Sequence, residues 1–126
     1  MIILVDTNVL IDFLRGYDSF IDIFKTERII ISGVVYSELL YGSKSEKEIY
    51  TIRELYRKFG TPETDLVDWE KTGLLIKKLK KSGITVSFQD AVLAGQCIET
   101  GRKLLTKDKH FQYIENALGI DITVKI

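Results

Sequence analysis

The chain has 126 residues, of which 45% are hydrophobic and 29% are charged, and it contains one proline. These proportions are typical of an ordinary folded domain and exclude a chain that is mainly disordered. The 18 Lys and Arg residues balance the 18 Asp and Glu residues, so a nucleic-acid binder with an overall basic surface is excluded as well.

Continuous apolar runs predict the strands of a sheet. Such runs are typical of strands that are buried on both faces of a parallel sheet. In chain order they cover residues 2–5, 29–31, 103–106 and 122–124. Helical segments separate them, which favours βαβ units over hairpins. We therefore expect an α/β fold in one domain over residues 1–126, with a parallel sheet of about four or five strands flanked by helices on both faces.

Capping residues and the helical spacing of apolar side chains predict the helices. Ser45 and Glu48 have the spacing of a capping box, Asp18 is placed to cap the second helix, and Gly101 supplies a helix end. The predicted helices cover residues 8–15, 18–24, 32–40, 45–59, 68–81 and 87–100. We expect Trp69 and Cys97 to lie in the core.

Cysteine and histidine are too scarce for the common zinc sites. Cys97 is the only cysteine, which excludes an internal disulfide and agrees with a reducing compartment. His110 is the only histidine, so a metal ion would be held by oxygen ligands. The apolar start of the chain ends at Asp6 and is too short for a signal peptide or a membrane span. We expect a cytoplasmic protein without a membrane segment.

Four acidic residues follow predicted strands or lie in the helices after them. We call them the acidic quartet: Asp6, Glu38, Asp90 and Asp108. Taken singly, the aspartates can cap helices or turns, and a helical glutamate is usually solvated. In an α/β fold, however, the carboxyl ends of the strands meet at one edge of the sheet. Together the four predict an acidic pocket, where the carboxylates would repel each other unless a cation lies among them.

The oxygen ligands of such a pocket indicate its chemistry. Carboxylates without cysteine or clustered histidine favour Mg²⁺ or Mn²⁺ over zinc. These ions can activate a water molecule and stabilise a phosphorus centre during displacement. Phosphodiester hydrolysis is therefore the leading reaction.

Four segments resemble the motif blocks of the PIN domain family. They are Val5-Asp6-Thr7-Asn8-Val9-Leu10-Ile11-Asp12, Ser37-Glu38-Leu39-Leu40-Tyr41-Gly42, Asp90-Ala91-Val92-Leu93-Ala94 and Leu105-Thr106-Lys107-Asp108-Lys109-His110-Phe111. The resemblance covers essentially the whole chain. The length, motif order and spacing are similar to those of the VapC-type toxin ribonucleases of toxin–antitoxin pairs.

This resemblance implies a Mg²⁺- or Mn²⁺-dependent endoribonuclease that acts on tRNA or rRNA. The acidic quartet would be both catalytic and metal-binding, with Asp6 and Asp90 as the most direct ligands. Asn8 and Thr106 match positions that support the site by hydrogen bonding. The resemblance also implies a homodimer and a VapB-type antitoxin that holds the toxin inactive.

Three alternatives stay open. A PIN-like RNA-processing nuclease would have no antitoxin, and a non-catalytic module would bind RNA or protein without cutting. The complete acidic quartet argues against the second of these, because carboxylates without metal repel a phosphate backbone. A phosphoaspartyl transferase of the haloacid-dehalogenase type needs a second aspartate two positions after the first, where this chain has Asn8.

Two further groups of residues point to partners. Large apolar side chains crowd the first two helices and form either a thick core or a groove for a partner peptide. They are Phe13, Leu14, Tyr17, Phe20, Ile21 and Phe24. Basic residues flank Asp90 and Asp108 and form either a solvated surface or a path that steers RNA. They are Lys77, Lys78, Lys80, Lys81, Arg102, Lys103, Lys107 and Lys109. For His110 we favour a structural role over that of a general base.

Overall fold

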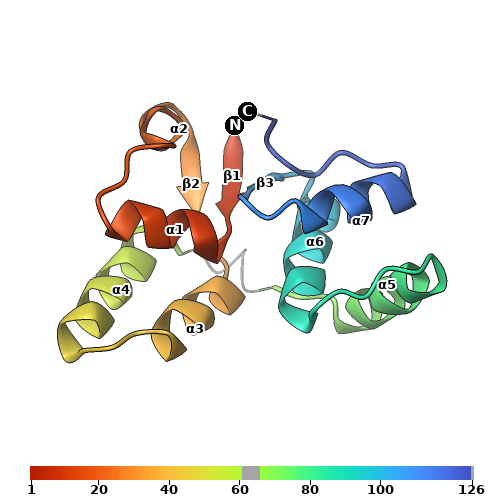
Figure 1. The fold of residues 1–126 in the computed structure, drawn as a ribbon, viewed down its shortest axis with the longest axis horizontal. Coiled ribbons are helices and arrows are strands. Elements are labelled where there is room, and N and C mark those ends of the chain that lie inside the picture. The colour runs from red at the N-terminus through yellow and green to blue at the C-terminus, as the bar shows by residue number, and fades with distance from the viewer. Residues whose placement is uncertain (61–65, 126) are drawn as a thin grey trace.

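A parallel sheet with the strand order β2-β1-β3 lies between two groups of helices (Figure 1). The computed structural model describes residues 1–60 and 66–125. The strands are β1 (Ile2–Val5), β2 (Arg28–Ile30) and β3 (Lys103–Leu105). In the central strand β1, Leu4 lies opposite Ile30 of β2 and Leu104 of β3. The predicted parallel α/β fold is confirmed.

The predicted number of strands was wrong for the described residues, which form a sheet of three strands. Residues 122–124 do run beside β3: the Leu104 amide donates to the Ile122 carbonyl at 2.7 Å, and the Val124 amide donates to the Leu104 carbonyl at 2.9 Å. Pairing stops at the single bridge between Leu104 and Thr123. The Ile122 amide donates to the Glu115 carboxylate instead, so the ladder does not extend further in that direction.

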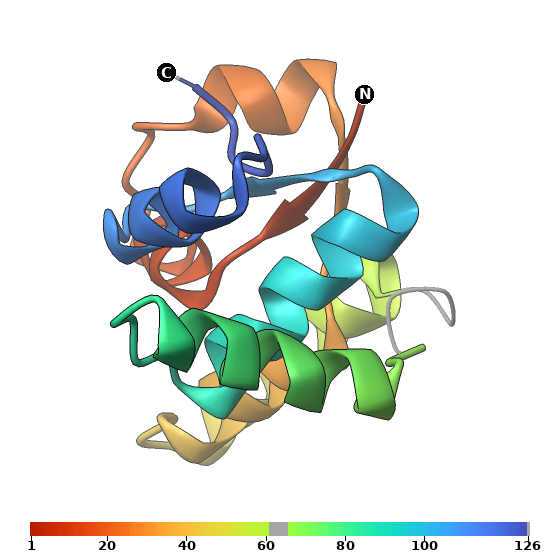
Figure 2. The same ribbon diagram turned by 90° about the vertical axis from the view of Figure 1, so that its right-hand side faces the viewer.

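The helices cover both sides of the sheet (Figures 1 and 2). They are α1 (Thr7–Leu14), α2 (Ile21–Thr26), α3 (Gly33–Tyr41), α4 (Glu46–Phe59), α5 (Trp69–Lys81), α6 (Phe88–Thr100) and α7 (His110–Leu118). Helices α1, α3 and α4 lie on one side, and α5, α6 and α7 lie on the other. Helices α4 and α6 are capped as expected by Ser45 and Ser87. The hydroxyls of these serines accept from the backbone amides of Glu48 and Asp90.

One helix prediction was wrong, and one helix was missed. Asp18 does not cap α2, because that helix begins at Ile21 and has Phe20 as its N-cap without a side-chain hydrogen bond. Helix α7 was not predicted at all. Its N-cap is Lys109, whose side chain makes no capping hydrogen bond, and the carboxylate of the preceding Asp108 accepts from the His110 amide.

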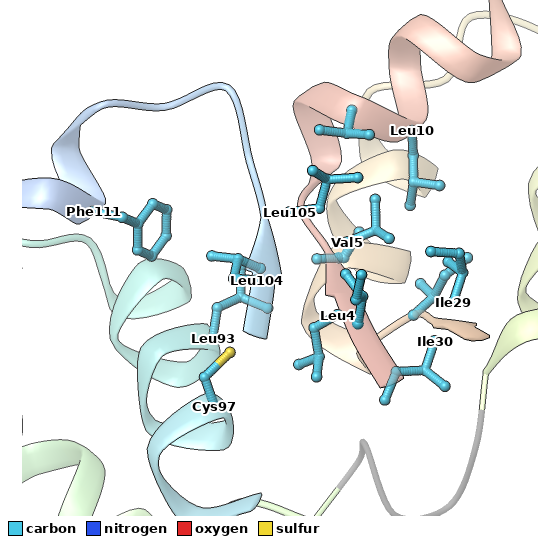
Figure 3. Packing of buried hydrophobic residues seen from close by; sticks show 14 of the residues in the cluster. Leu4, Val5, Leu10, Ile29, Ile30, Leu93, Cys97, Leu104, Leu105 and Phe111 are labelled. Carbon is cyan, nitrogen blue, oxygen red and sulfur yellow. The ribbon is translucent and has the colours of Figure 1, made fainter. Parts of the chain in front are cut away.

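The core forms where the strands meet α1 and α6. Leu4 and Val5 of β1 are almost fully buried, as are Leu104 and Leu105 of β3. Figure 3 shows Leu93 and Cys97 of α6 beside Leu104. The small residues of α6 let this helix approach the sheet closely.

Cys97 lies in the core as predicted, whereas Trp69 does not. Burial raises the pKa of the Cys97 thiol to about 12, and the charge of Lys103 offsets only part of this effect. Trp69 is 66% exposed and stacks on Phe88, which is 53% exposed, with 6.2 Å between the ring centroids. Trp69 and Phe88 begin α5 and α6, and their stacked rings lie at the surface rather than in the core.

The apolar residues of the first two helices mainly extend the core. Phe13 and Phe24 stack with 4.8 Å between ring centroids, and both pack against the core together with Phe20. The cavity among them has a volume of only about 10 Å³, and Tyr17 stays exposed at its margin. This volume favours a thick core over a peptide groove at this place.

Within the described ranges, none of the helices is both long enough and apolar enough to cross a membrane.

Candidate acidic site

Asp6 lies at the carboxyl end of the central strand and is buried. Its backbone amide donates to the Leu105 carbonyl of β3 at 2.9 Å, so the turn after β1 is tied to the neighbouring strand. Its carboxylate caps α1, because Oδ1 accepts from the Thr7 amide at 2.8 Å. The cap and the predicted site therefore involve the same side chain, and Oδ2 faces the rest of the site.

Thr106 and Asn8 connect Asp6 to the loop after β3. The Thr106 hydroxyl donates to Asp6 Oδ2 at 2.7 Å and accepts from the Asp108 amide at 3.0 Å. Asn8 Nδ2 lies 3.4 Å from both Asp6 Oδ2 and Thr106 Oγ1, and Asn8 Oδ1 accepts from the Lys107 amide at 3.1 Å. These contacts hold two chain segments about 100 residues apart in one arrangement.

The other quartet members come from three different elements. Glu38 lies in α3 beside the buried Leu39 and is partly buried itself. Asp90 lies in the first turn of α6 and is also partly buried. Asp108 lies in the exposed loop after β3, where its Oδ1 accepts from the His110 amide at 2.9 Å. Asp108 thus performs the turn-capping role that was its alternative explanation.

Electrostatics show that the four carboxyl groups are neighbours. Burial is the main cause that raises the pKa of Asp6, and the charge of Asp108 raises it further, while hydrogen bonds from Thr106 and the Thr7 amide lower it. Burial is also the largest cause that raises the pKa of Glu38 and of Asp90, and the charge of Asp6 is the second largest. Asp6 therefore interacts electrostatically with each of the other three carboxyl groups.

The chemistry of this cluster fits a hard divalent cation. Carboxylates that raise one another's pKa carry negative charge without a compensating partner, and a bound cation would relieve it. Thr7 lies in the same turn as Asp6, and a hydrogen bond from its side chain lowers the pKa of Glu38, though less than burial and the charge of Asp6 raise it. Among residues 1–60 and 66–125, no three His, Cys, Asp or Glu side chains are close enough to share one ion. Mg²⁺ commonly binds through one or two carboxylates and keeps several waters, so the donor set still fits.

Two contacts around the site were not predicted from the sequence. Lys107 Nζ forms an ion pair with Asp12 of α1 at 2.6 Å, which ties the Asp108 loop to α1 a second time. His110 Nε2 lies 3.1 Å from the Thr85 carbonyl oxygen. A carbonyl can only accept, so Nε2 carries a proton and links the start of α7 to the loop before α6. Local sequence patterns do not predict these pairs, because Lys107 and Asp12 are 95 positions apart and His110 and Thr85 are 25 positions apart.

The basic residues near the quartet are partly engaged. Lys107 is paired with Asp12, and Lys103 is paired with Asp121 at 3.0 Å. Lys77, Lys78, Lys80 and Lys81 are exposed near the end of α5. The pair with Asp12 leaves Lys107, next to Asp108, less available for steering RNA.

Comparison with known proteins gives one family and several similar folds. A model of the PIN domain family matches residues 3–117. No curated protein matches the chain significantly. Among solved structures, the chain is similar to one from the DNA-bound VapBC of Salmonella typhimurium, with a TM-score of 0.78, 20% identity, and coverage of 98% of this chain and 97% of that chain.

Two further structures are similar to the same extent. For VapBC-1 from nontypeable Haemophilus influenzae the TM-score is 0.75 with 23% identity, covering 99% of this chain and 98% of that chain. For VapBC2 from Rickettsia felis, bound to a DNA fragment from its promoter, the TM-score is 0.75 with 22% identity, covering 98% of both chains. At this level of identity the likeness concerns the fold.

Proposed function

Because the chain belongs to the PIN domain family, we propose that it is a metal-dependent endoribonuclease that hydrolyses RNA phosphodiester bonds at the acidic quartet. The observation that carries this proposal is the position of Asp6 at the carboxyl end of β1, where Thr106 connects its carboxylate to the loop of Asp108 and its charge raises the pKa of Glu38 and Asp90. Such a concentration of carboxylates costs stability and suits a site whose charge a cation neutralises.

The proposed roles follow from where each side chain is held. Asp6 and Asp90 would bind Mg²⁺ or Mn²⁺ most directly, and Glu38 and Asp108 would complete the acidic surroundings. Thr106 and Asn8 keep Asp6 Oδ2 in one orientation. When bound, the ion would lower the pKa of a water molecule and stabilise the charge that develops on the phosphate.

Cleavage of RNA by the Asp6→Asn variant tests this function. We expect the purified wild-type chain to cut tRNA or rRNA in Mg²⁺ or Mn²⁺ and to be inactive in chelator. The variant has nearly the same shape and should lose activity by more than about 100-fold, a larger loss than is typical for residues that only orient a ligand. Equal cutting by wild type and variant would point to a contaminating nuclease and contradict the proposal.

We also propose that the protein is a VapC-type toxin that acts in the cytoplasm and binds a VapB-type antitoxin. The fold similarity to chains of VapBC assemblies supports this assignment over a nuclease without antitoxin. Expression of the chain alone should stop the growth of a bacterial host, and co-expression with the product of an adjacent short reading frame should restore it. Normal growth with abundant, active protein would instead favour an RNA-processing nuclease.

A homodimer is the proposed assembly. The stacked pair of Trp69 and Phe88 leaves two large apolar rings exposed on the side of the molecule formed by α5 and α6. A second copy would remove these rings from water, which is the usual driving force for association.

A further inference from the structure

A pocket separate from the sheet edge opens between α1, α3 and α4 and reaches the acidic quartet through Glu38. Its volume is about 360 Å³, which is in the range of pockets that bind small organic ligands. Figure 1 shows these three helices together on one side of the sheet. Because Glu38 lines the pocket, whatever occupies it lies directly beside the proposed cleavage site.

The lining of this pocket combines an apolar floor with a cationic rim. Aliphatic side chains from all three helices form the floor: Ile11, Leu14, Leu39 and Ile52. The rim carries Arg15 at the end of α1, Lys44 in the loop after α3, and Lys47 at the start of α4. An apolar surface suits the face of a base, and exposed cations suit the phosphates on either side of it.

The three rim cations are available to a ligand. Within residues 1–60 and 66–125 none of Arg15, Lys44 and Lys47 forms an ion pair, in contrast to Lys71, Lys103 and Lys107. The acids that line the pocket are Glu38 and Glu48. Glu48 Oε2 already accepts from the Lys44 amide at 2.7 Å, and Glu38 belongs to the quartet whose charge the proposed metal ion would neutralise. The three cations outnumber these two acids, so the lining of the pocket is net positive.

We infer that this pocket binds one nucleotide of the RNA strand next to the cleavage point, with the base on the apolar floor and the backbone phosphates at Arg15, Lys44 and Lys47. The inference rests on the proposed ribonuclease function. RNA is favoured over a protein segment because a strand that is cut at the quartet must continue to either side of it. The pocket is the surface next to the acidic quartet, and it carries cations where the quartet carries carboxylates that repel phosphate.

The test compares two double variants that remove the same charge at opposite ends of the sheet. Lys44→Gln/Lys47→Gln alters the pocket rim. Lys25→Gln/Arg28→Gln is the matched control, since Lys25 lies in α2 and Arg28 begins β2, both exposed and away from the pocket. Both are made in the Asp6→Asn background, so that a short labelled single-stranded RNA can be titrated by fluorescence anisotropy in Mg²⁺ without being cut.

We expect the rim variant to bind RNA more weakly and with a shallower salt dependence. The slope of log K against log salt should fall by about 0.7 for each phosphate contact removed, while the control keeps the parent slope. With Asp6 restored, the rim variant should show a raised KM and a kcat close to that of wild type.

Equal RNA affinity and an equal salt slope in the rim variant and its parent would overturn the inference. This holds even if the rim variant binds the antitoxin less well, because the pocket would then bind the antitoxin and not RNA. In that case cleavage by the wild-type chain would leave the proposed function intact. If the Asp6→Asn parent does not bind RNA and the wild-type chain does not cut it, the proposed function fails as well.

Discussion

The Thr106 hydroxyl serves two parts of the acidic site at once. It donates to Asp6 Oδ2 and accepts from the Asp108 amide, at 2.7 and 3.0 Å. One oxygen therefore sets both the direction of the central carboxylate and the position of the loop that carries the last quartet member. Hydrogen bonds of this kind, one step removed from a metal ligand, commonly affect activity strongly.

Replacement of Thr106 by valine should lower ribonuclease activity by about 10- to 100-fold, because valine keeps the shape but leaves both hydrogen bonds unmade. Thr106→Ser retains the hydroxyl and is the matched control, for which we expect activity within a few-fold of wild type. Steady-state cleavage of a labelled RNA measures both. Full activity in Thr106→Val would show that Asp6 does not depend on this contact.

The raised pKa of Asp90 links the quartet to stability. Burial raises it first, followed by the charges of Asp6 and Asp108, so the folded chain holds a proton there more readily than the unfolded chain. The ionised form therefore costs stability at a pH above the raised pKa, and this cost disappears as the pH falls through it. Without metal, the site works against folding at neutral pH.

We expect Asp90→Asn to raise the midpoint of thermal unfolding of the metal-free protein at neutral pH by a few degrees. The gain should vanish when the pH is below the ordinary aspartate pKa of 3.8, where Asp90 is protonated in both the folded and the unfolded chain. Added Mg²⁺ should stabilise the wild type and stabilise the variant less. Asp22→Asn, in the exposed face of α2, is the control; an equal gain there would mean that general charge, not the quartet, sets the effect.

At the level of elements, local signals decided what the sequence could predict. The apolar runs of β1, β2 and β3 predicted buried strands, and the caps at Ser45 and Ser87 predicted α4 and α6. That the four carboxyl groups lie near one another was predictable because strand ends in a parallel sheet share one edge, whereas their catalytic and metal-binding roles stay predictions. Helix α7 was missed although Asp108 and Gly119 mark its two ends, and the exposure of Trp69 was not predictable because burial at the start of a helix depends on tertiary contacts.

Glu115 of α7 explains how the end of the chain is held. Its buried carboxylate accepts from the Ile122 and Thr123 amides at 2.8 and 3.1 Å and from Lys125 Nζ at 2.8 Å. Burial alone would raise its pKa, but these donors outweigh burial, so the pKa is lowered. This stability is present at neutral pH and is lost as the pH falls through the lowered pKa.

Glu115→Ala should reduce the free energy of unfolding by about 1–3 kcal/mol, because two backbone amides lose their acceptor in the interior. Lys125→Ala should cost less than about 1 kcal/mol, since that side chain is largely exposed. Denaturant titrations of both variants give the comparison. A larger loss for Lys125→Ala would mean that the ion pair, and not the amide contacts, holds the segment.

At the level of the whole molecule, Trp69 reports on assembly because it is the only tryptophan and is exposed in the single chain. If a second copy covers α5 and α6, its fluorescence emission should move to shorter wavelength as the protein concentration rises through the dissociation range. Phe88→Ser should weaken association and shift this transition to higher concentration. A dimer, measured by light scattering, whose Trp69 emission does not change would place the interface elsewhere.

The buried Cys97 has a practical consequence at the same scale. A thiol with a pKa of about 12 inside the core is protonated and shielded at ordinary pH, so it reacts poorly with maleimides and other alkylating reagents. Since it is the only cysteine in the chain, a new cysteine placed on the surface would be the one position that accepts a dye or spin label. The native sequence can therefore be labelled at a chosen site without first removing a cysteine from its core.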